Sequence, residues 1–295
     1  MSQKVFLTGC TGEVGSRLTS HLLREGYQVF GTRGSRKCEI NNPRHTCWKV
    51  NMLDPFVDLE LKTIKPKLLI HTAWVTTPKV FWNSDSNVQW IEASKKLISE
   101  FEKSGGDRIV VTGSCAEYSW NSNAPLSENS PESPASSYGK SKLELLNWIR
   151  DRNLDFLWTR TFFQFGMKEN GGRLVPALID SLHKGEAFQV RSGYDTRDFV
   201  FVEDVIDVLA ILISKESRDV VNIGSGCGVL AGDIARTIAE MFKREDLLIV
   251  ENNEMERSKV VSNPEKLNSI IGNYRWTPIE TALMKTIEAR QGSNP

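Results

Sequence analysis

The chain lacks the features that mark nucleic-acid-binding or membrane-spanning proteins. Its 295 residues carry 37 basic and 37 acidic side chains, so the formal net charge is zero and no basic face favours nucleic acid. No apolar run approaches the roughly 18 residues that a membrane span needs. Residues 1–3 lead straight into an apolar strand, which leaves no room for a signal peptide. We therefore expect a soluble, cytoplasmic protein without a membrane or nucleic-acid partner.

Cysteine and histidine are also scarce. The five cysteines are odd in number and show no C-x-x-C spacing, which argues against both a disulfide framework and a zinc site. None of the four histidines has metal-ligand spacing. The sequence thus predicts no metal and a reducing compartment. The cysteines are Cys10, Cys38, Cys47, Cys115 and Cys227.

A glycine-rich turn stands near the N-terminus. Residues 4–8 have the pattern of a short buried strand, Thr8-Gly9-Cys10-Thr11-Gly12-Glu13-Val14-Gly15 follows at once, and a helical pattern comes next. Gly9 permits the tight turn, Gly12 lets backbone N–H groups approach a pyrophosphate, and Gly15 allows close packing of helix and strand. An ordinary glycine-rich turn is the alternative, but the order strand, turn, helix favours dinucleotide binding.

The end of the second predicted strand favours NADP over NAD. An NAD-preferring site places Asp or Glu there to bind the ribose 2′-hydroxyl. Here the strand at 28–32 continues as Arg33-Gly34-Ser35-Arg36-Lys37. Guanidinium groups suit a 2′-phosphate, which a carboxylate would repel. The alternative is that these cations only solvate a surface loop.

A phenol and an ammonium lie one helical turn apart in the middle of the chain. A polar loop with three prolines, 123–134, precedes a helical pattern from Ser136, so Tyr138 and Lys142 share a helix face. A nearby cation favours the phenolate, and we therefore expect the pKa of Tyr138 to fall from about 10 toward the range of a general acid or base. A surface tyrosine beside a lysine is the usual meaning of this spacing. Ser114, directly after an apolar strand at 108–113, weakens that alternative.

Together these motifs resemble the extended short-chain dehydrogenases/reductases, in particular their nucleotide-sugar epimerase, dehydratase and reductase group, over almost the whole chain. Besides the glycine turn and the Tyr-x-x-x-Lys motif, Ser114 matches the Ser/Thr four residues before a tyrosine, here Tyr118, and Asn87 matches a structural asparagine. Residues 160–166 resemble the segment that faces the nicotinamide, and 197–205 resemble the signature of the C-terminal domain.

The resemblance implies a role for each site residue. Tyr138 is the proton donor, Ser114 holds the substrate oxygen, and Lys142 tunes Tyr138 and holds the nicotinamide ribose. Arg197 and Arg257 are expected to bind the substrate diphosphate, with a structural ion pair as the alternative for Arg197. The cofactor-binding residues are expected to be Gly9, Thr11, Gly12, Glu13, Val14, Thr32, Arg33, Arg36, Asn51, Met52, Ala73, Trp74, Tyr138, Lys142 and Phe162. The substrate-binding residues are expected to be Ser114, Cys115, Tyr138, Arg173, Val175, Arg197 and Arg257.

Departures from the family pattern narrow the reaction. Dehydratases of this family carry an Asp-Glu pair after the Ser/Thr, where this chain has Cys115 and Ala116. Enzymes that epimerise and reduce use a cysteine and a histidine at positions that are Ala116 and Arg173 here. We therefore expect NADPH-dependent reduction of the C4 keto group of a nucleotide-linked 4-keto-6-deoxy sugar. The alternatives are a nucleotide-sugar epimerase with bound NAD(P) and a non-catalytic NADP-sensing protein.

The expected fold is α/β: a Rossmann-type doubly wound parallel sheet with a smaller C-terminal substrate lobe. Residues 1–165 would form the dinucleotide-binding domain and 166–295 mainly the lobe, with about 199–224 returning to the first domain. Strands are expected at 4–8, 28–32, 46–50, 68–72, 108–112, 155–160 and 220–224. Helices are expected near 13–25, 56–64, 87–104, 137–152, 173–184, 203–215, 230–243 and 278–290.

A homodimer is expected as well, because similar proteins pair the two helices near 87–104 and 137–152 with their copies in a four-helix bundle. These helices offer more apolar positions than one buried stripe requires. The positions are Trp90, Leu97, Ile98, Phe101, Leu145, Leu146, Trp148 and Ile149.

Overall fold

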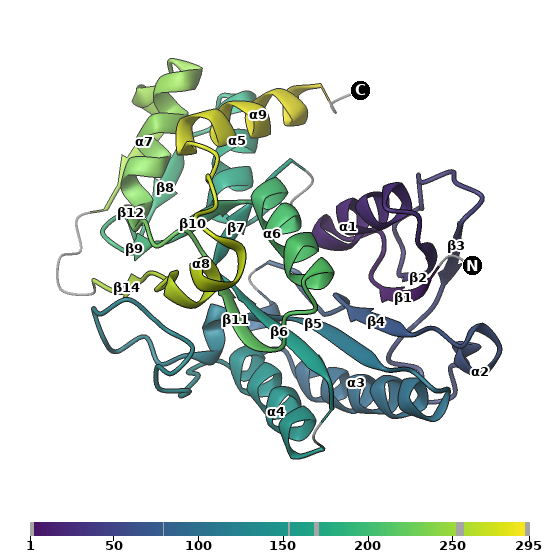
Figure 1. The fold of residues 1–295 in the computed structure, drawn as a ribbon. Helices are drawn as coiled ribbons and strands as arrows, with labels where there is room; N and C mark the ends of the chain where they lie inside the picture. The colour runs from purple at the N-terminus through teal and green to yellow at the C-terminus, as the bar shows by residue number, and fades with distance from the viewer. Residues whose placement is uncertain (1–2, 79, 153, 168–170, 252–256, 293–295) are drawn as a thin grey trace.

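A computed structural model describes residues 3–78, 80–152, 154–167, 171–251 and 257–292. Its centre is a sheet of seven parallel strands in the order β11-β6-β5-β4-β1-β2-β3 (Figure 1). The strands are β1 (Lys4–Thr8), β2 (Gln28–Arg33), β3 (His45–Lys49), β4 (Leu68–His71), β5 (Arg108–Ser114), β6 (Phe156–Thr161) and β11 (Asp219–Ile223). The strand order reverses between β1 and β4, which is the switch point where such sheets bind ligands. The predicted Rossmann-type fold is confirmed.

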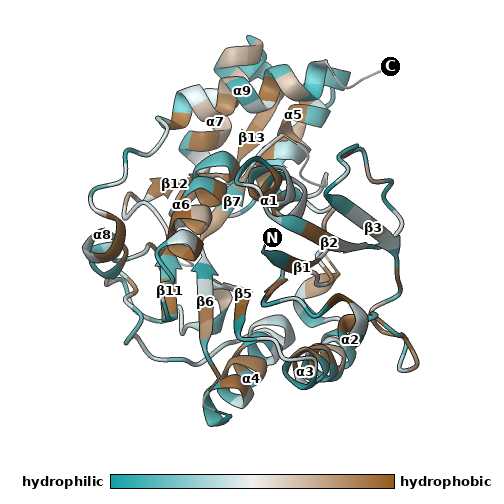
Figure 2. Ribbon diagram, turned by 45° about the vertical axis from the view of Figure 1, so that its right-hand side comes forward, coloured by the Kyte–Doolittle hydropathy of each residue, from teal (hydrophilic) through white to brown (hydrophobic). Residues whose placement is uncertain are grey.

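Helices cover both faces of this sheet because its strands are apolar on both sides. In β1, Val5 and Leu7 face the core beneath α1 (Glu13–Arg24) and α6 (Val202–Ser214), whereas Phe6 faces the core beneath α3 (Ser86–Lys103) and α4 (Ser137–Asp151). Figure 2 shows the matching alternation of hydrophobic and hydrophilic positions along these helices. The sheet and its two cores therefore hold the carboxyl ends of β1, β4 and β5 in fixed positions.

The C-terminal lobe lies beyond the carboxyl end of the sheet (Figure 1). Its core packs α5 (Leu174–Lys184), α7 (Ala231–Phe242) and α9 (Ile279–Gln291) against short strand pairs. Sequence patterns missed α8 (Glu265–Ile271) and every one of these pairs, since strands of two or three residues carry no period. The pairs are formed by β7 (Phe163–Phe165) with β10 (Phe199–Phe201), β8 (Phe188–Val190) with β13 (Leu248–Val250), and β9 (Thr196–Arg197) with β12 (Val229–Leu230) and β14 (Lys259–Val260).

The helix expected at 56–64 is wrong for most of its length, because α2 covers only Leu61–Ile64. Before it, the carboxylate of Asp54 accepts a hydrogen bond from the backbone N–H of Phe56, and that of Asp58 accepts one from Glu60, each at 2.9 Å. Such side-chain bonds compete with helical ones and favour turns.

The argument for a dimer from surplus apolar positions is also wrong. Leu97, Ile98 and Phe101 of α3, and Leu145, Leu146 and Ile149 of α4, are at most 1% exposed, because they form the chain's own core. The other two positions of the argument, Trp90 and Trp148, are half-buried and pack against the same core. The homodimer stays a prediction without this support.

Three side chains that can bind metals meet in the tertiary structure, although their spacing along the chain gives no sign of a metal site. Cys10, His45 and Cys47 place one ligand-type atom each within 4.8 Å of the others. Spacing along the chain could not show this, because the pairing of β2 with β3 brings Cys47 beside Gly31 and so near the glycine turn.

Candidate active site

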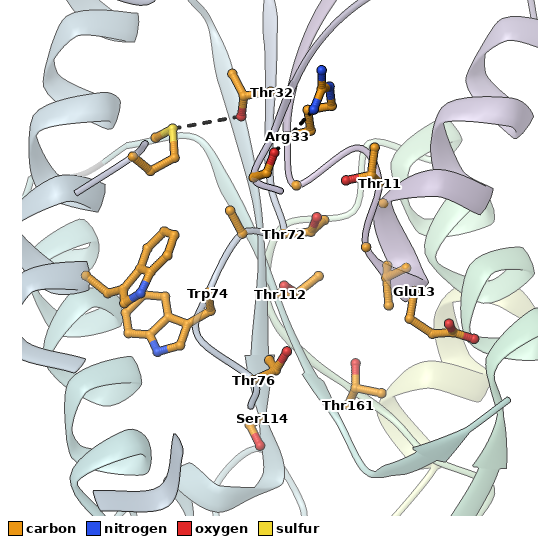
Figure 3. Close-up of a pocket in the computed structure, with 18 of the residues that line it drawn as sticks. Thr11, Glu13, Thr32, Arg33, Thr72, Trp74, Thr76, Thr112, Ser114 and Thr161 are labelled. Carbon is orange, nitrogen blue, oxygen red and sulfur yellow. Dashed lines mark hydrogen bonds between the residues drawn. The ribbon is translucent and has the colours of Figure 1, made fainter. Parts of the chain in front are cut away.

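A pocket of about 460 Å³ opens at the carboxyl ends of the central strands, at the switch point (Figure 3). Every residue expected to contact the cofactor lines it, and so do Ser114, Tyr138, Lys142 and Arg173. Sequence reasoning missed two threonines of the lining, Thr72 after β4 and Thr112 in β5. Their position at predicted strand ends was the available signal. Thr161, at the end of β6, also lines the pocket and belongs to the segment 160–166 that was expected to face the nicotinamide.

The glycine turn is shaped for close approach. Gly9 has a φ of +76°, which favours glycine, and a Cβ on Gly15 would lie 2.1 Å from the Gly9 carbonyl oxygen. Gly12 precedes the first residue of α1, so the N-terminal end of that helix faces the pocket. Backbone N–H groups and the helix dipole favour an anion there, so these residues fit the pyrophosphate of a dinucleotide.

The adenosine end of the pocket is cationic. Arg33 donates to the carbonyl oxygens of Gly34 and Arg36, at 3.4 and 3.2 Å, and the loop after β2 is exposed. Among the described lining residues the only carboxylate is that of Glu13, which lies at the start of α1 in a 3.1 Å ion pair with Arg17. No acidic side chain therefore lines the end of β2.

Ser114 is held by its own local structure. It ends β5, its backbone N–H donates to Glu117 Oε1 at 2.8 Å, and its Oγ accepts from the N–H of Ala116 at 3.2 Å, which is a capping box. Glu117 is fully buried and accepts hydrogen bonds from Trp158 Nε1 and Arg160 Nε. The acid that follows Ser114 in the chain thus has a structural partner and does not point to elimination chemistry.

Tyr138 lies among aromatic rings beside Ser114. Its ring contacts those of Phe81, Trp82 and Trp74 edge-on, with centroids 5.1, 5.9 and 6.5 Å away. Burial raises the pKa of Tyr138, while Arg173 and then a hydrogen bond with Ser114 oppose the rise. The expectation of a lowered pKa is wrong for this structure, because loss of water outweighs the nearby charge.

Lys142 does not act on Tyr138 as expected. Its Nζ atom donates to the Thr112 carbonyl oxygen at 2.9 Å and lies 6.0 Å from the centre of the Tyr138 ring. The side chain is 2% exposed, and burial lowers the pKa of Lys142 to about 7 although Glu117 opposes the shift. Arg173, on the loop before α5, is therefore the cation with the larger effect on Tyr138.

The remaining residues expected to bind substrate lie outside the pocket lining. Cys115 follows Ser114 and is buried. Burial raises the pKa of Cys115 to about 12, so its thiol stays protonated at neutral pH and cannot accept a proton. Val175 lies in the core of the lobe, and Arg257 lies over the ring of Tyr194, 4.9 Å from its centre. The structure does not bring these side chains to Tyr138.

Arg197 forms a structural ion pair, which was the alternative to binding the substrate diphosphate. Its guanidinium pairs with Asp195 at 2.6 Å and donates to the Ser258 carbonyl oxygen at 2.9 Å. It also faces the rings of Trp120 and Phe163, 5.5 and 5.2 Å away. The expectation that Arg197 offers a free fork to a diphosphate is thus not supported, because both of its terminal nitrogens have protein acceptors.

Comparison with known proteins decides the family. The model of the NAD-dependent epimerase/dehydratase family matches residues 5–224. The chain belongs to this family. The resemblance to extended short-chain dehydrogenases/reductases is therefore confirmed, and the protein has the site of an enzyme of this class.

Proteins similar to this chain differ in their reactions. A GDP-6-deoxy-D-talose 4-dehydrogenase of Aggregatibacter actinomycetemcomitans is 25% identical, over 97% of this chain and 98% of its own. A UDP-glucose 4-epimerase of Bacillus subtilis is 22% identical, over 82% of this chain and 83% of its own. Among solved structures, an NAD-dependent NDP-hexosamine 5,6-dehydratase of tunicamycin biosynthesis is 22% identical with a TM-score of 0.86 over 99% of both chains. Another is a UDP-N-acetylglucosamine 4-epimerase from Methanobrevibacter ruminantium, which is 20% identical with a TM-score of 0.84 over 99% of both chains.

No helix among the described residues has both the length and the apolar character to cross a membrane.

Proposed function

We propose that this family member uses NADPH to reduce the C4 keto group of a nucleotide-linked 4-keto-6-deoxy sugar. The observation that carries the proposal is the set of groups near Tyr138. Ser114, Tyr138 and Lys142 line one pocket, while Cys115 and Ala116 occupy the positions of the dehydratase acids and Glu117 is paired with Arg160. Among the residues that the structure describes, the site has groups for proton transfer to a carbonyl oxygen, whereas the two positions of the dehydratase acids carry no acidic side chain.

The chemistry then follows from the side chains. Bound NADPH would supply a hydride to C4, which becomes a secondary alcohol. The Tyr138 hydroxyl donates the proton that the carbonyl oxygen takes up, and its raised pKa keeps it protonated until that oxygen becomes basic. Ser114 donates a second hydrogen bond to the same oxygen. Lys142 holds the nicotinamide ribose and Arg173 stabilises the developing tyrosinate.

Support for NADPH comes from the adenosine end. Thr32, Arg33 and Arg36 line it without a carboxylate, so a 2′-phosphate meets donors and no repulsion. Similar structures include an NAD-dependent enzyme and a complex with NAD⁺, which makes cofactor preference the first quantity to measure. The relative named a 4-dehydrogenase supports redox chemistry at the 4-position.

Direct assay tests the proposal. Purified protein is incubated with NADPH or NADH and a panel of nucleotide-linked 4-keto-6-deoxy sugars, and loss of reduced-cofactor absorbance is followed while NMR gives the product configuration. We expect turnover with NADPH that disappears in Tyr138→Phe. Interconversion of C4 epimers without added cofactor would instead establish the epimerase alternative. Tight NADPH binding without turnover of any sugar would favour the non-catalytic one.

A further inference from the structure

Metal-ligand side chains converge behind the glycine turn. The sulfurs of Cys10 and Cys47 lie 3.3 Å apart, and a ring nitrogen of His45 is within 4.8 Å of both. Cys10 follows Gly9, and His45 and Cys47 alternate on β3, so their side chains point to the same face of the sheet. A Cβ on Gly31 would lie 2.7 Å from Cys10 Sγ and 3.2 Å from His45 Nε2. The absence of a side chain at Gly31 therefore leaves room for the three to meet.

A fourth candidate ligand comes from the loop between β2 and β3. Cys38 Sγ lies 3.9 Å from His45 Nδ1, and the Cys38 thiol also interacts with that of Cys47. Cys38 does not belong to the group whose ligand atoms all lie within 4.8 Å of one another, so its side chain must move to complete the set. Three thiols and one imidazole form the Cys₃His set that structural zinc sites use.

One nitrogen of the His45 imidazole is buried and not satisfied by the protein residues that the structure describes. This atom, Nε2, has no hydrogen-bond partner among the described residues, an arrangement that costs free energy in a folded protein. An imidazole nitrogen is a common zinc ligand, so a cation bound at this atom would remove that cost.

The distance between the sulfurs of Cys10 and Cys47 can be compared with the values expected in a zinc site and in a disulfide. A tetrahedral ion with Zn–S bonds of about 2.3 Å holds two sulfurs about 3.7 Å apart. A disulfide requires about 2.05 Å. At 3.3 Å, Cys10 and Cys47 are closer to the metal geometry, which a shift of a few tenths of an ångström would reach.

We propose that Cys10, Cys47 and His45, with Cys38 as the fourth ligand, bind a zinc ion that joins the glycine turn to β3. The backbone N–H groups of Gly9 and Cys10 both donate to the Thr32 carbonyl oxygen at 2.9 Å, so the site lies directly behind the adenosine end of the pocket. Binding would displace thiol protons and order the loop that carries Arg36. The ion has a structural role and takes no part in hydride transfer, so the inference does not depend on the proposed function.

Metal titration of the full chain tests this inference. Reduced protein freed of metal with a chelator is titrated with Zn²⁺ and, separately, with Co²⁺. We expect one Zn²⁺ per chain, a rise in Tm, and with Co²⁺ the absorption bands of a tetrahedral thiolate complex. Cys47→Ser and His45→Gln should each weaken Zn²⁺ binding at least tenfold. Cys227→Ser, which alters an exposed cysteine away from the cluster, should bind like the wild type.

Other outcomes overturn the inference. Absence of stoichiometric Zn²⁺ binding by the reduced wild type would do so, as would equal binding by the wild type, Cys47→Ser and His45→Gln. A Cys10–Cys47 disulfide that forms in air, found by peptide mass mapping in protein that binds no Zn²⁺ after reduction, would show a redox pair instead. If Cys47→Ser does not fold, Cys38→Ser and His45→Gln provide the same comparison. The side chains of Cys38 and His45 are only partly buried, unlike that of Cys10.

Discussion

The Nζ atom of Lys142 lies 3.9 Å from the centre of the Trp74 ring. Trp74 is fixed there by a 2.9 Å hydrogen bond from its Nε1 to Asn87 Oδ1 and by stacking on Trp90, with centroids 5.7 Å apart. An aromatic face stabilises a desolvated cation, so it offsets part of the cost of burying this ammonium. Asn87 therefore acts on the site through Trp74.

Cofactor capture should depend on the protonation of Lys142. Its pKa of about 7 in the folded protein lies below the ordinary 10.5, so the charged fraction falls as the pH rises above about 7. We expect kcat/KM for NADPH to decline above that pH, because the free enzyme then lacks the cation that binds the ribose. In Lys142→Arg, which keeps its charge, the decline should be absent relative to that variant's own maximum. A wild-type profile that stays flat to pH 9 would contradict the lowered pKa.

Removal of the Tyr138 hydroxyl should abolish most turnover. We expect Tyr138→Phe to lower kcat by about 10²–10⁴-fold, the usual contribution of a positioned general acid, and to leave NADPH affinity nearly unchanged. Tyr118→Phe is the matched control, since that buried hydroxyl donates to Asn222 Oδ1 at 2.8 Å and lies outside the pocket lining. Normal turnover by Tyr138→Phe would assign the proton donor to another group.

The adenosine end should discriminate between NADPH and NADH. Arg33→Ala is expected to lose about 1.5–3 kcal/mol of NADPH binding, the contribution of a charge-assisted hydrogen bond, with little change for NADH. Fluorescence titration at low salt measures both affinities. Lys37→Ala removes a charge from the same loop at a residue outside the pocket lining and serves as control. Equal affinities of the wild type for the two cofactors would refute the NADP assignment.

Isotope labelling should separate reduction from proton abstraction. In D₂O with unlabelled NADPH, we expect C4 of the product to carry protium and C3 and C5 to carry no deuterium, because no described side chain near Tyr138 is placed as a carbon base. NMR of the sugar provides the measurement. Enzyme-dependent deuterium at C3 or C5 would reveal such a base and support an epimerising reaction.

The sheet and the glycine turn could be predicted because their signals are local. The apolar run before Gly9 and the helical pattern after it specify β1, the turn and α1 without reference to the rest of the chain. Tyr138 and Lys142 share a helix face for the same reason. These elements bring the predicted cofactor residues to one pocket.

Other properties depend on tertiary contacts that spacing does not reveal. The pKa of Tyr138 depends on how completely its surroundings exclude water, and the guanidinium of Arg197 donates to Ser258, which lies 61 residues further along the chain. Cys10 meets Cys47 only through the register in which Gly31 lies opposite Cys47. A sequence pattern contains neither solvent exclusion nor register between strands.

The place of β11 in the sheet sets an order of events for the newly made chain. The side chains of Leu18 and Leu22 on α1 are covered by Val205 and Leu209 of α6, and β6 gains its outer neighbour only when β11 pairs with it. These residues leave the ribosome after the whole of 1–165. Until α6 and β11 are made, the edge of β6 is unpaired and the apolar side of α1 is uncovered. The cofactor-binding domain therefore cannot complete its sheet and core before the first part of the lobe has been synthesised. The cofactor-binding domain and the C-terminal lobe therefore finish folding together, although they form different sides of the ligand site.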